Sequence, residues 1–125
     1  MKKALITGIA GQDGSYLSEH LLSLGYEVHG IVRRHSVAEN QNHRLDKLGL
    51  NDHVHTHYGD LLDYPSLVRI TQEVQPDEIY NLGAMSHVRI SFDMPSFTIQ
   101  TNALGVLNML EVYRTLVPEA KFYQA

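Results

Sequence analysis

The chain has 125 residues, of which 43% are hydrophobic and 19% charged, so it has the composition of a soluble globular protein and the length of one domain over residues 1–125. The formal net charge of −4 gives no electrostatic footprint for nucleic acid, and the absence of cysteine excludes disulfides and thiolate metal sites. The apolar run after Lys2 and Lys3 is too short for a signal peptide or a membrane span. We therefore expect a cytoplasmic protein that binds neither nucleic acid nor membranes.

The first expected element is a buried strand over residues 3–8, which leads directly into glycines spaced three apart at Gly8, Gly11 and Gly14. Apolar residues then recur at helical spacing from Tyr16 onwards. A strand, a tight glycine turn and a helix form the context that a dinucleotide-binding loop requires, because the helix N-terminus offers N–H groups to phosphates. An ordinary glycine-rich turn is the alternative.

The rest of the chain continues to alternate between strands and helices. The further strands are expected over residues 27–32, 53–58, 78–82 and 121–125, and the helices over residues 12–24, 43–48, 64–74 and 95–116. Asp63 and Pro65 suit the N-cap and the first turn of the third of these helices. This alternation predicts an α/β protein with a doubly wound parallel sheet of the Rossmann type, in the strand order 3-2-1-4-5, with ligands beyond the carboxyl ends of the strands.

The end of the second strand favours one nicotinamide cofactor over the other. An acidic residue at this position usually binds the adenosine ribose hydroxyls of NAD, but this chain has Arg33 and Arg34 there. Guanidinium groups cannot accept a hydrogen bond from a hydroxyl, whereas they can pair with a 2′-phosphate and stack on adenine. The two arginines therefore predict NADP, and two solvated surface arginines are the alternative.

The ends of the third and fourth strands carry further candidate residues. The Asp60 carboxylate can accept a hydrogen bond from an adenine amino group and Leu61 can cover the ring, although Gly-Asp is also common in turns. The fourth strand leads into NLGAMSH, where small residues let the backbone approach the nicotinamide side and polar ones can bind a substrate: Gly83, Ala84, Ser86 and His87. A plain exit from strand to loop is the alternative.

Two other features receive weaker interpretations. His53, His55 and His57 alternate and so share one face of the third strand, but the sequence places no carboxylate or fourth ligand beside them, and we expect no metal site. Asn102 interrupts the apolar pattern of the last helix. A mid-helix Asn near the core needs a hydrogen-bond partner, so it is expected to brace a loop or to hold groups near the active site. The apolar residues of that pattern are Phe97, Leu104, Leu107 and Leu110.

Four segments carry a resemblance to a known family. They read ALITGIAGQDGSYLSEHLLSLGYEVHGIVRR (residues 4–34), HYGDL (57–61), VQPDEIYNLGAMSHVRISFD (74–93) and KFYQA (121–125). In these segments the chain resembles the GDP-mannose 4,6-dehydratase family of the extended short-chain dehydrogenase/reductase superfamily. The resemblance covers the amino-terminal part of such an enzyme.

The resemblance implies a redox-neutral dehydration of GDP-mannose. NADP takes a hydride from C4 of the hexose, water is lost across C5 and C6, and the hydride returns at C6 to give GDP-4-keto-6-deoxymannose. The residues implied at the pyrophosphate are Gly8, Ile9, Ala10, Gly11, Gln12, Asp13 and Gly14. The other cofactor-binding residues implied are Arg33, Arg34, Asp60, Leu61, Leu82, Gly83, Ala84, Met85, Ser86 and Phe97, and the substrate contacts are Ser86 and His87. Residues 33–44 would lie near a subunit interface of a homodimer or tetramer.

The chain departs from the family pattern in two places and lacks its catalytic residues. The family usually has Tyr where Phe97 stands and Asp where Asn102 stands, and Asn there is common in related sugar-nucleotide epimerases and dehydratases. These enzymes also use a Ser/Thr, a Glu and a Tyr-x-x-x-Lys pair, but no tyrosine of this chain has Lys four positions later. We therefore expect an amino-terminal piece truncated at strand five that is inactive alone. The alternatives are another epimerase, dehydratase or reductase of the superfamily, or a non-catalytic NADP-binding module.

Overall fold

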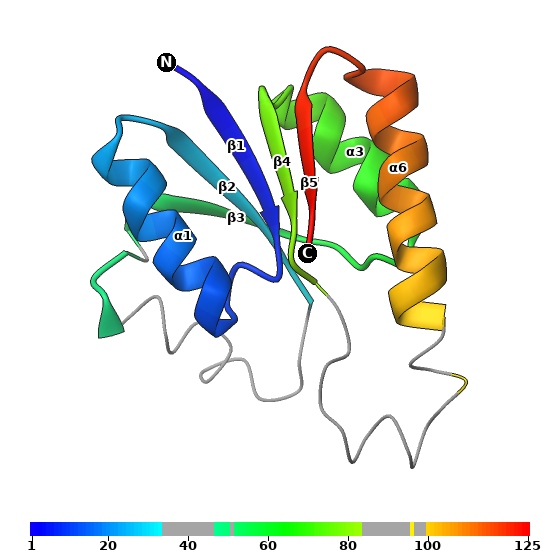
Figure 1. Cartoon of the computed structure of the whole chain (residues 1–125), viewed down its shortest axis with the longest axis horizontal. Helices are drawn as coiled ribbons and strands as arrows, with labels where there is room; N and C mark the ends of the chain where they lie inside the picture. The colour runs from blue at the N-terminus through cyan, green and yellow to red at the C-terminus, as the bar shows by residue number, and fades with distance from the viewer. Residues whose placement is uncertain (34–46, 51, 84–95, 97–99) are drawn as a thin grey trace.

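The computed structural model describes residues 1–33, 47–50, 52–83, 96 and 100–125 (Figure 1). Strands alternate with helices in this part of the chain, as predicted, except between β2 and β3, where most residues lie outside the described part. The strands are β1 (Lys3–Thr7), β2 (Glu27–Val32), β3 (Val54–Tyr58), β4 (Glu78–Asn81) and β5 (Lys121–Gln124). The helices are α1 (Gln12–Ser23), α3 (Tyr64–Val74) and α6 (Gly105–Leu116), with the π-helical turn η2 (Gln100–Leu104) directly before α6. Most of the short helix predicted over residues 43–48 lies outside the described residues.

The five strands are parallel and lie in the order β3-β2-β1-β4-β5, which confirms the predicted order 3-2-1-4-5. β1 occupies the centre of the sheet, and its residues Ala4, Leu5 and Ile6 have no exposed surface. A central parallel strand is covered on both faces, which is why this run is continuously apolar and does not alternate. All carboxyl ends point to one end of the sheet (Figure 1), the end where the predicted ligand loops begin.

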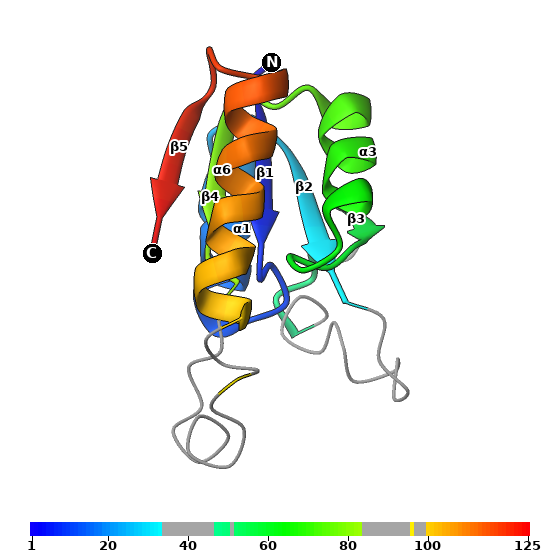
Figure 2. The ribbon, with the colours of Figure 1, turned by 90° about the vertical axis from the view of Figure 1, so that its right-hand side faces the viewer.

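Helices cover both faces of the sheet (Figures 1 and 2), and a hydrophobic core forms on each face. On one face α1 covers β1 and β2, with Ile6 and Leu21 in the core. On the other face α3 and α6 pack side by side, and Ile70 and Met109 are fully buried between them and the sheet. The sheet is therefore the middle of three layers. None of the described helices is long and apolar enough to cross a membrane.

α1 lies close to the sheet because its buried face is made largely of small residues. Gly14, Ser15 and Ser18 are buried there, and the Ser18 hydroxyl donates to the Gly14 carbonyl oxygen at 2.7 Å. This bond satisfies a polar group that has no access to water. Two large residues of the predicted helical pattern, Tyr16 and Leu24, are instead 56% and 60% exposed.

The described part of the last helix corrects the predicted core. Leu104, Leu107 and Leu110 are 43%, 53% and 41% exposed, and Asn102 is exposed as well. The residues that α6 buries are Gly105, Met109 and Val112. The apolar spacing identified a helix but not the side that faces the sheet. The fourth residue of the predicted pattern, Phe97, lies outside the described residues.

Gly105 explains this orientation of α6. A Cβ built on Gly105 would lie 3.0 Å from the Cβ of Leu61, so the helix backbone rests against the loop that follows β3. Asn108, one turn later, donates through Nδ2 to the carbonyl oxygen of Leu61 at 2.7 Å. These two contacts bring the glycine side of the helix inward and leave the leucine side outward.

α3 begins and ends where the sequence predicts, with one difference at its start. Asp63 occupies the N-cap position and Pro65 lies in the first turn, but the Asp63 side chain makes no capping hydrogen bond. The Asp63 backbone carbonyl instead accepts a hydrogen bond from the Ser66 hydroxyl at 2.8 Å. Gln75 follows the last helical residue as the C-cap and has a left-handed φ of 51°.

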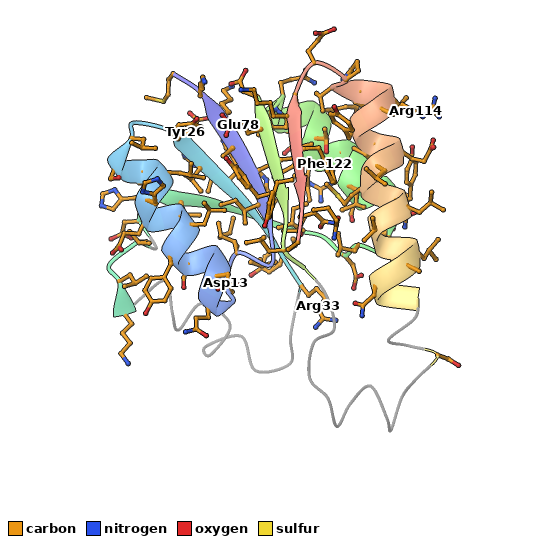
Figure 3. All side chains as sticks on the ribbon, in the orientation of Figure 1. Asp13, Tyr26, Arg33, Glu78, Arg114 and Phe122 are labelled. Atoms are coloured by element: carbon orange, nitrogen blue, oxygen red, sulfur yellow. The ribbon has the colours of Figure 1, made fainter. Side chains whose placement is uncertain are left out.

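A buried carboxylate joins β2 and β4 near the amino-terminal end of the sheet (Figure 3). Glu78 accepts hydrogen bonds from the hydroxyls of Tyr26 at 2.7 Å and Tyr80 at 2.5 Å. These bonds hold the pKa of Glu78 below its ordinary value of 4.5. Burial and the bond to Glu78 raise the pKa of Tyr80 to about 12, so Tyr80 stays a neutral donor. The charged carboxylate is therefore the form that the fold stabilises.

Replacing Tyr80 by Phe should lower the free energy of unfolding by about 1 kcal/mol at pH 7, because Glu78 loses a donor. Because the pKa of Glu78 is lowered on folding, its contribution is present above pH 4.5 and is lost as the pH falls through the folded-state value. Urea unfolding at pH 7 and at acidic pH should therefore show a difference between wild type and variant that shrinks in acid.

The control for this experiment is Tyr16→Phe, which removes a hydroxyl from an exposed position on α1. It should unfold like the wild type at both pH values. A Tyr80→Phe variant with wild-type stability at pH 7, or with a deficit that does not change with pH, would contradict the stabilising role of the Glu78 carboxylate.

Candidate functional site

The loop between β1 and α1 is as tight as its glycine spacing predicts. Gly8 has a φ of +71°, a left-handed conformation that glycine adopts without strain. A Cβ on Gly14 would lie 2.3 Å from the Gly8 carbonyl oxygen, and a Cβ on Gly8 would lie 3.0 Å from the backbone nitrogen of Gly83. A side chain at either position would force the loop away from α1 or from the exit of β4.

The N-terminus of α1 opens at the carboxyl end of the sheet. Its N-cap is Gly11, and no side chain makes a capping hydrogen bond there. The side chain of Asp13, in the first turn, is exposed and lies at this end of the molecule (Figure 3). The first N–H groups of a helix and its partial positive charge bind anions, so this helix end suits a phosphate group.

A chain of hydrogen bonds joins the last residues of β1, β4 and β5 beside this loop. Thr7 Oγ1 donates to Asn81 Oδ1 at 2.5 Å, and Asn81 Nδ2 donates to Gln124 Oε1 at 2.7 Å. The Thr7 hydroxyl also accepts from the backbone N–H of Gly83 at 2.9 Å. Thr7 and Asn81 are both 1% exposed, so water does not compete for these bonds. The exit of β4 is thereby fixed against the glycine loop.

The sequence interpretation assigned no role to these polar strand ends. A signal was present, because Thr7, Asn81 and Gln124 each come at the carboxyl end of an expected strand. In the sheet Thr7 pairs with Asn81, and Asn81 pairs with Gln124. Strand order alone would place them in one row, but it would not show that their side chains form a continuous network.

A pocket with a volume of about 750 Å³ lies beyond the carboxyl ends of β2 and β3. It brings together two residues that the sequence predicts for the site, Arg33 and Asp60. The lining residues that the sequence interpretation did not assign to the site are Tyr58, Gly59, Asp63, Pro65, Ser66 and Arg69. Arg69 donates through Nη2 to the carbonyl oxygen of Tyr58 at 3.1 Å, which ties α3 to the end of β3. Two guanidinium groups and two carboxylates thus line one pocket.

Asp60 and Leu61 have different environments after β3. Asp60 lines the pocket, and its Oδ1 accepts from the backbone N–H of Leu62 at 2.9 Å, which orients the carboxylate. The Leu61 side chain is buried in the core, and a Cβ on Gly83 would lie 3.1 Å from its Cδ1. Asp60 therefore lines the pocket whereas Leu61 belongs to the core, and the contacts of both residues with an adenine ring stay predictions.

The remaining predicted residues divide into two groups. Those of the first group lie in the described part of the chain at the same end of the sheet: Ile9, Ala10, Gln12 and Leu82. Those of the second group lie outside the described residues: Arg34, Ala84, Met85, Ser86, His87 and Phe97. The structure thus brings the glycine loop against the β4 exit, and it brings Arg33 and Asp60 into one pocket. The roles of all these residues stay predictions.

Comparison with known sequences points to one family. The model of a family described as GDP-mannose 4,6 dehydratase matches residues 5–125. A GDP-mannose 4,6-dehydratase of Vibrio cholerae is 55% identical over an alignment of 131 positions, which includes 99% of this chain and 35% of that protein. The chain thus spans about a third of the length of the curated relatives that it matches.

Comparison with solved structures supports the fold. A UDP-glucose 4-epimerase of Thermotoga maritima, solved with UDP-glucose, matches with a TM-score of 0.78 and 26% identity over 98% of this chain and 37% of its own. A UDP-glucose 4-epimerase of Thermus thermophilus, solved in complex with NAD, matches with a TM-score of 0.73 and 30% identity over 90% of this chain and 33% of its own.

Replacing Thr7 by Val tests the network at the strand ends. The change keeps the side-chain shape but leaves Asn81 Oδ1 and the Gly83 N–H without their Thr7 partner. Unsatisfied buried groups are costly, so we expect the free energy of unfolding to fall by about 1–3 kcal/mol in a denaturant titration.

Thr71→Val is a matched control, because Thr71 is also fully buried but its hydroxyl has no hydrogen-bond partner among the described residues. This variant should be as stable as the wild type or more stable. An equal decrease in the free energy of unfolding for the two variants would show that the hydrogen bonds of the Thr7 hydroxyl do not stabilise the fold. It would contradict the role of the network in fixing the β4 exit.

Proposed function

This chain belongs to the GDP-mannose 4,6-dehydratase family, and we propose that it forms the NADP-binding part of an enzyme that converts GDP-mannose to GDP-4-keto-6-deoxymannose. The chain spans about a third of the length of its curated relatives. The activity of the whole enzyme is therefore part of the proposal. It also includes assembly of the intact enzyme as a homodimer or tetramer in the cytoplasm.

The observation that carries the cofactor assignment is the shape of the glycine loop. At Gly8 and Gly14 a Cβ would meet backbone atoms, so the loop is closed to side chains at the two positions that set its turn. The uncapped N-terminus of α1 follows directly and suits the pyrophosphate of a dinucleotide. A solved structural neighbour of 30% identity was crystallised with NAD, which supports a nicotinamide cofactor here.

The pocket beyond β2 and β3 supports NADP as that cofactor. Arg33 follows the last residue of β2, at the position where an acidic side chain would bind the ribose hydroxyls of NAD. We assign Arg33 and Arg34 to the adenosine 2′-phosphate, and Asp60 to the adenine amino group. The assignment rests on the donor chemistry of guanidinium, which pairs with phosphate and cannot accept from a hydroxyl.

The chain's residues would bind and orient the cofactor and the substrate. Bound NADP would supply the reversible hydride transfer that the dehydration needs at C4 and C6 of the hexose. The α1 N–H groups would hold the pyrophosphate, and the exit of β4, fixed by Thr7, would set the position of the nicotinamide side. Ser86 and His87 are proposed to hydrogen-bond the substrate. The Tyr-x-x-x-Lys pair of the superfamily is absent from this sequence.

Replacing Arg33 and Arg34 together by Ala should weaken NADPH binding at least tenfold and weaken NADH binding much less. Each charge-assisted hydrogen bond to the 2′-phosphate contributes about 1.5–3 kcal/mol, and NADH has no such group. Calorimetric titration with both cofactors measures the two losses.

Arg114→Ala is the matched control, because it removes an exposed guanidinium in the last turn of α6. Arg114 and Arg33 lie at opposite ends of the molecule (Figure 3). It should change neither affinity. Equal losses for NADPH and NADH in the double variant would contradict the NADP assignment, while leaving the assignment of a nicotinamide cofactor in place.

The 125-residue chain alone should not turn over GDP-mannose in the presence of NADP. Positioned acid and base groups contribute factors of about 10² to 10⁴ each, and the tyrosine and lysine that the superfamily uses are not in this sequence. Chromatographic detection of GDP-4-keto-6-deoxymannose tests this expectation. Product formed by the purified chain, free of any longer enzyme, would overturn the proposed division between cofactor binding and proton transfer.

A further inference from the structure

Five titratable side chains gather on the α3 side of the sheet, and two of them, His57 and Glu73, adjoin the pocket residues Tyr58 and Arg69. Glu27 and His29 are the first and third residues of β2, and His55 and His57 belong to the neighbouring edge strand β3. Glu73 of α3 completes the group, with its Oε2 3.8 Å from Nδ1 of His57. The group consists of three imidazoles between two carboxylates and has no role in the proposed dehydration.

Strand pairing creates this group. His29 is paired with His55 in the register of β2 and β3, and their rings stack with centroids 4.7 Å apart. The sequence placed only the histidines of β3 on one face and offered no carboxylate beside them. The neighbouring strand supplies both a third imidazole and the carboxylate of Glu27.

Three of these side chains present their donor atoms to one another. One ligand atom each of Glu27, His29 and His55 can be chosen so that all three lie within 4.8 Å of one another. Tetrahedral zinc has bonds of about 2.0–2.2 Å to nitrogen and oxygen, which places neighbouring donor atoms roughly 3.3 Å apart. Small rotations of the exposed His55 ring and the flexible Glu27 side chain can bring the three donor atoms to this spacing, for which Glu27 and His29 move slightly apart from 2.7 Å.

The hydrogen bonds around His29 fix which of its nitrogens faces the carboxylate. Nε2 lies 2.7 Å from Glu27 Oε2, and Nδ1 lies 3.0 Å from Nε2 of His57. A carboxylate oxygen and an imidazole lone pair repel each other at 2.7 Å unless a proton or a cation lies between them. A metal ion bound at Nε2 would replace that proton, while the Nδ1–H donates to His57.

His57 and Glu73 then form an outer layer around the site. A metal-bound histidine commonly donates its second ring N–H to a partner that fixes the ring orientation. His57 is such a partner for His29, and its other nitrogen faces Glu73. His57 is itself only 18% exposed, which limits competition from water. Lys3 lies 4.0 Å from Glu27 Oε2, but its long side chain is 42% exposed and can move into solvent.

We propose that Glu27, His29 and His55 form a binding site for a divalent transition metal ion such as Zn²⁺. Two imidazoles and a carboxylate are ligands that zinc accepts, with water in the remaining position. The ion would cross-link β2 to the edge strand β3. Its ligands lie in the amino-terminal halves of these strands, whereas the nucleotide loops lie at the carboxyl ends.

Titration of the metal-free chain with Zn²⁺ alone, followed by calorimetry, tests the proposal. We expect one site per chain. His55→Gln removes an exposed ligand and should weaken binding at least tenfold, since even loss of an outer-layer partner weakens metal sites by about 10–100-fold. His20→Gln is the matched control, because His20 is exposed on α1, which covers the opposite face of the sheet. It should bind like the wild type.

Thermal unfolding provides a second measurement that also reports whether the variants fold. In EDTA the wild type, His55→Gln and His20→Gln should unfold cooperatively, and Zn²⁺ should raise the melting temperature of the wild type and His20→Gln only. If His55→Gln does not fold, Glu27→Gln takes its place with the same expected loss. Absence of a one-to-one site, wild-type binding by the ligand variant, or equal losses in the control would overturn the proposal.

Discussion

The contact between the backbones of Gly8 and Gly83 is the constraint on which the candidate site depends. The two loops meet so closely that a single Cβ at Gly8 would lie 3.0 Å from the Gly83 nitrogen. The Thr7 hydroxyl maintains this contact, since it accepts from the Gly83 N–H and donates to Asn81. The glycine loop and the exit of β4 are therefore one structural unit, and a ligand bound by the first is held at a defined position relative to the second.

Small residues extend the same constraint into the helices. Gly14 lets α1 approach the turn, and Gly105 lets α6 approach the loop after β3. Each of these two helices therefore makes its closest approach at a glycine, while some large side chains of its predicted pattern, Tyr16 on α1 and the leucines on α6, face outward. The close packing explains why exposed leucines on α6 and exposed Tyr16 on α1 are compatible with a well-packed core.

The two ends of the sheet differ in chemistry. The carboxyl ends carry the glycine loop, the uncapped N-terminus of α1 and the pocket with Arg33 and Asp60. The amino-terminal halves of the strands carry pre-paired charges: Glu78 lies between two tyrosine hydroxyls, and Glu27 bonds to His29. Helix N–H groups and guanidinium groups thus lie at one end, and hydrogen-bonded carboxylates lie at the other.

The sequence by itself determined the alternation of strands and helices, the parallel order, the glycine loop and the family, because these depend on local spacing and on motifs that are contiguous in the chain. It did not determine which side of α6 faces the core, since that depends on how closely Gly105 approaches Leu61. Nor did it reveal the Thr7–Asn81–Gln124 row or the Glu27–His29–His55 group, each of which combines residues from more than one strand. Only the register of the folded sheet decided these contacts, because side chains far apart in the chain become neighbours through hydrogen bonds between strands.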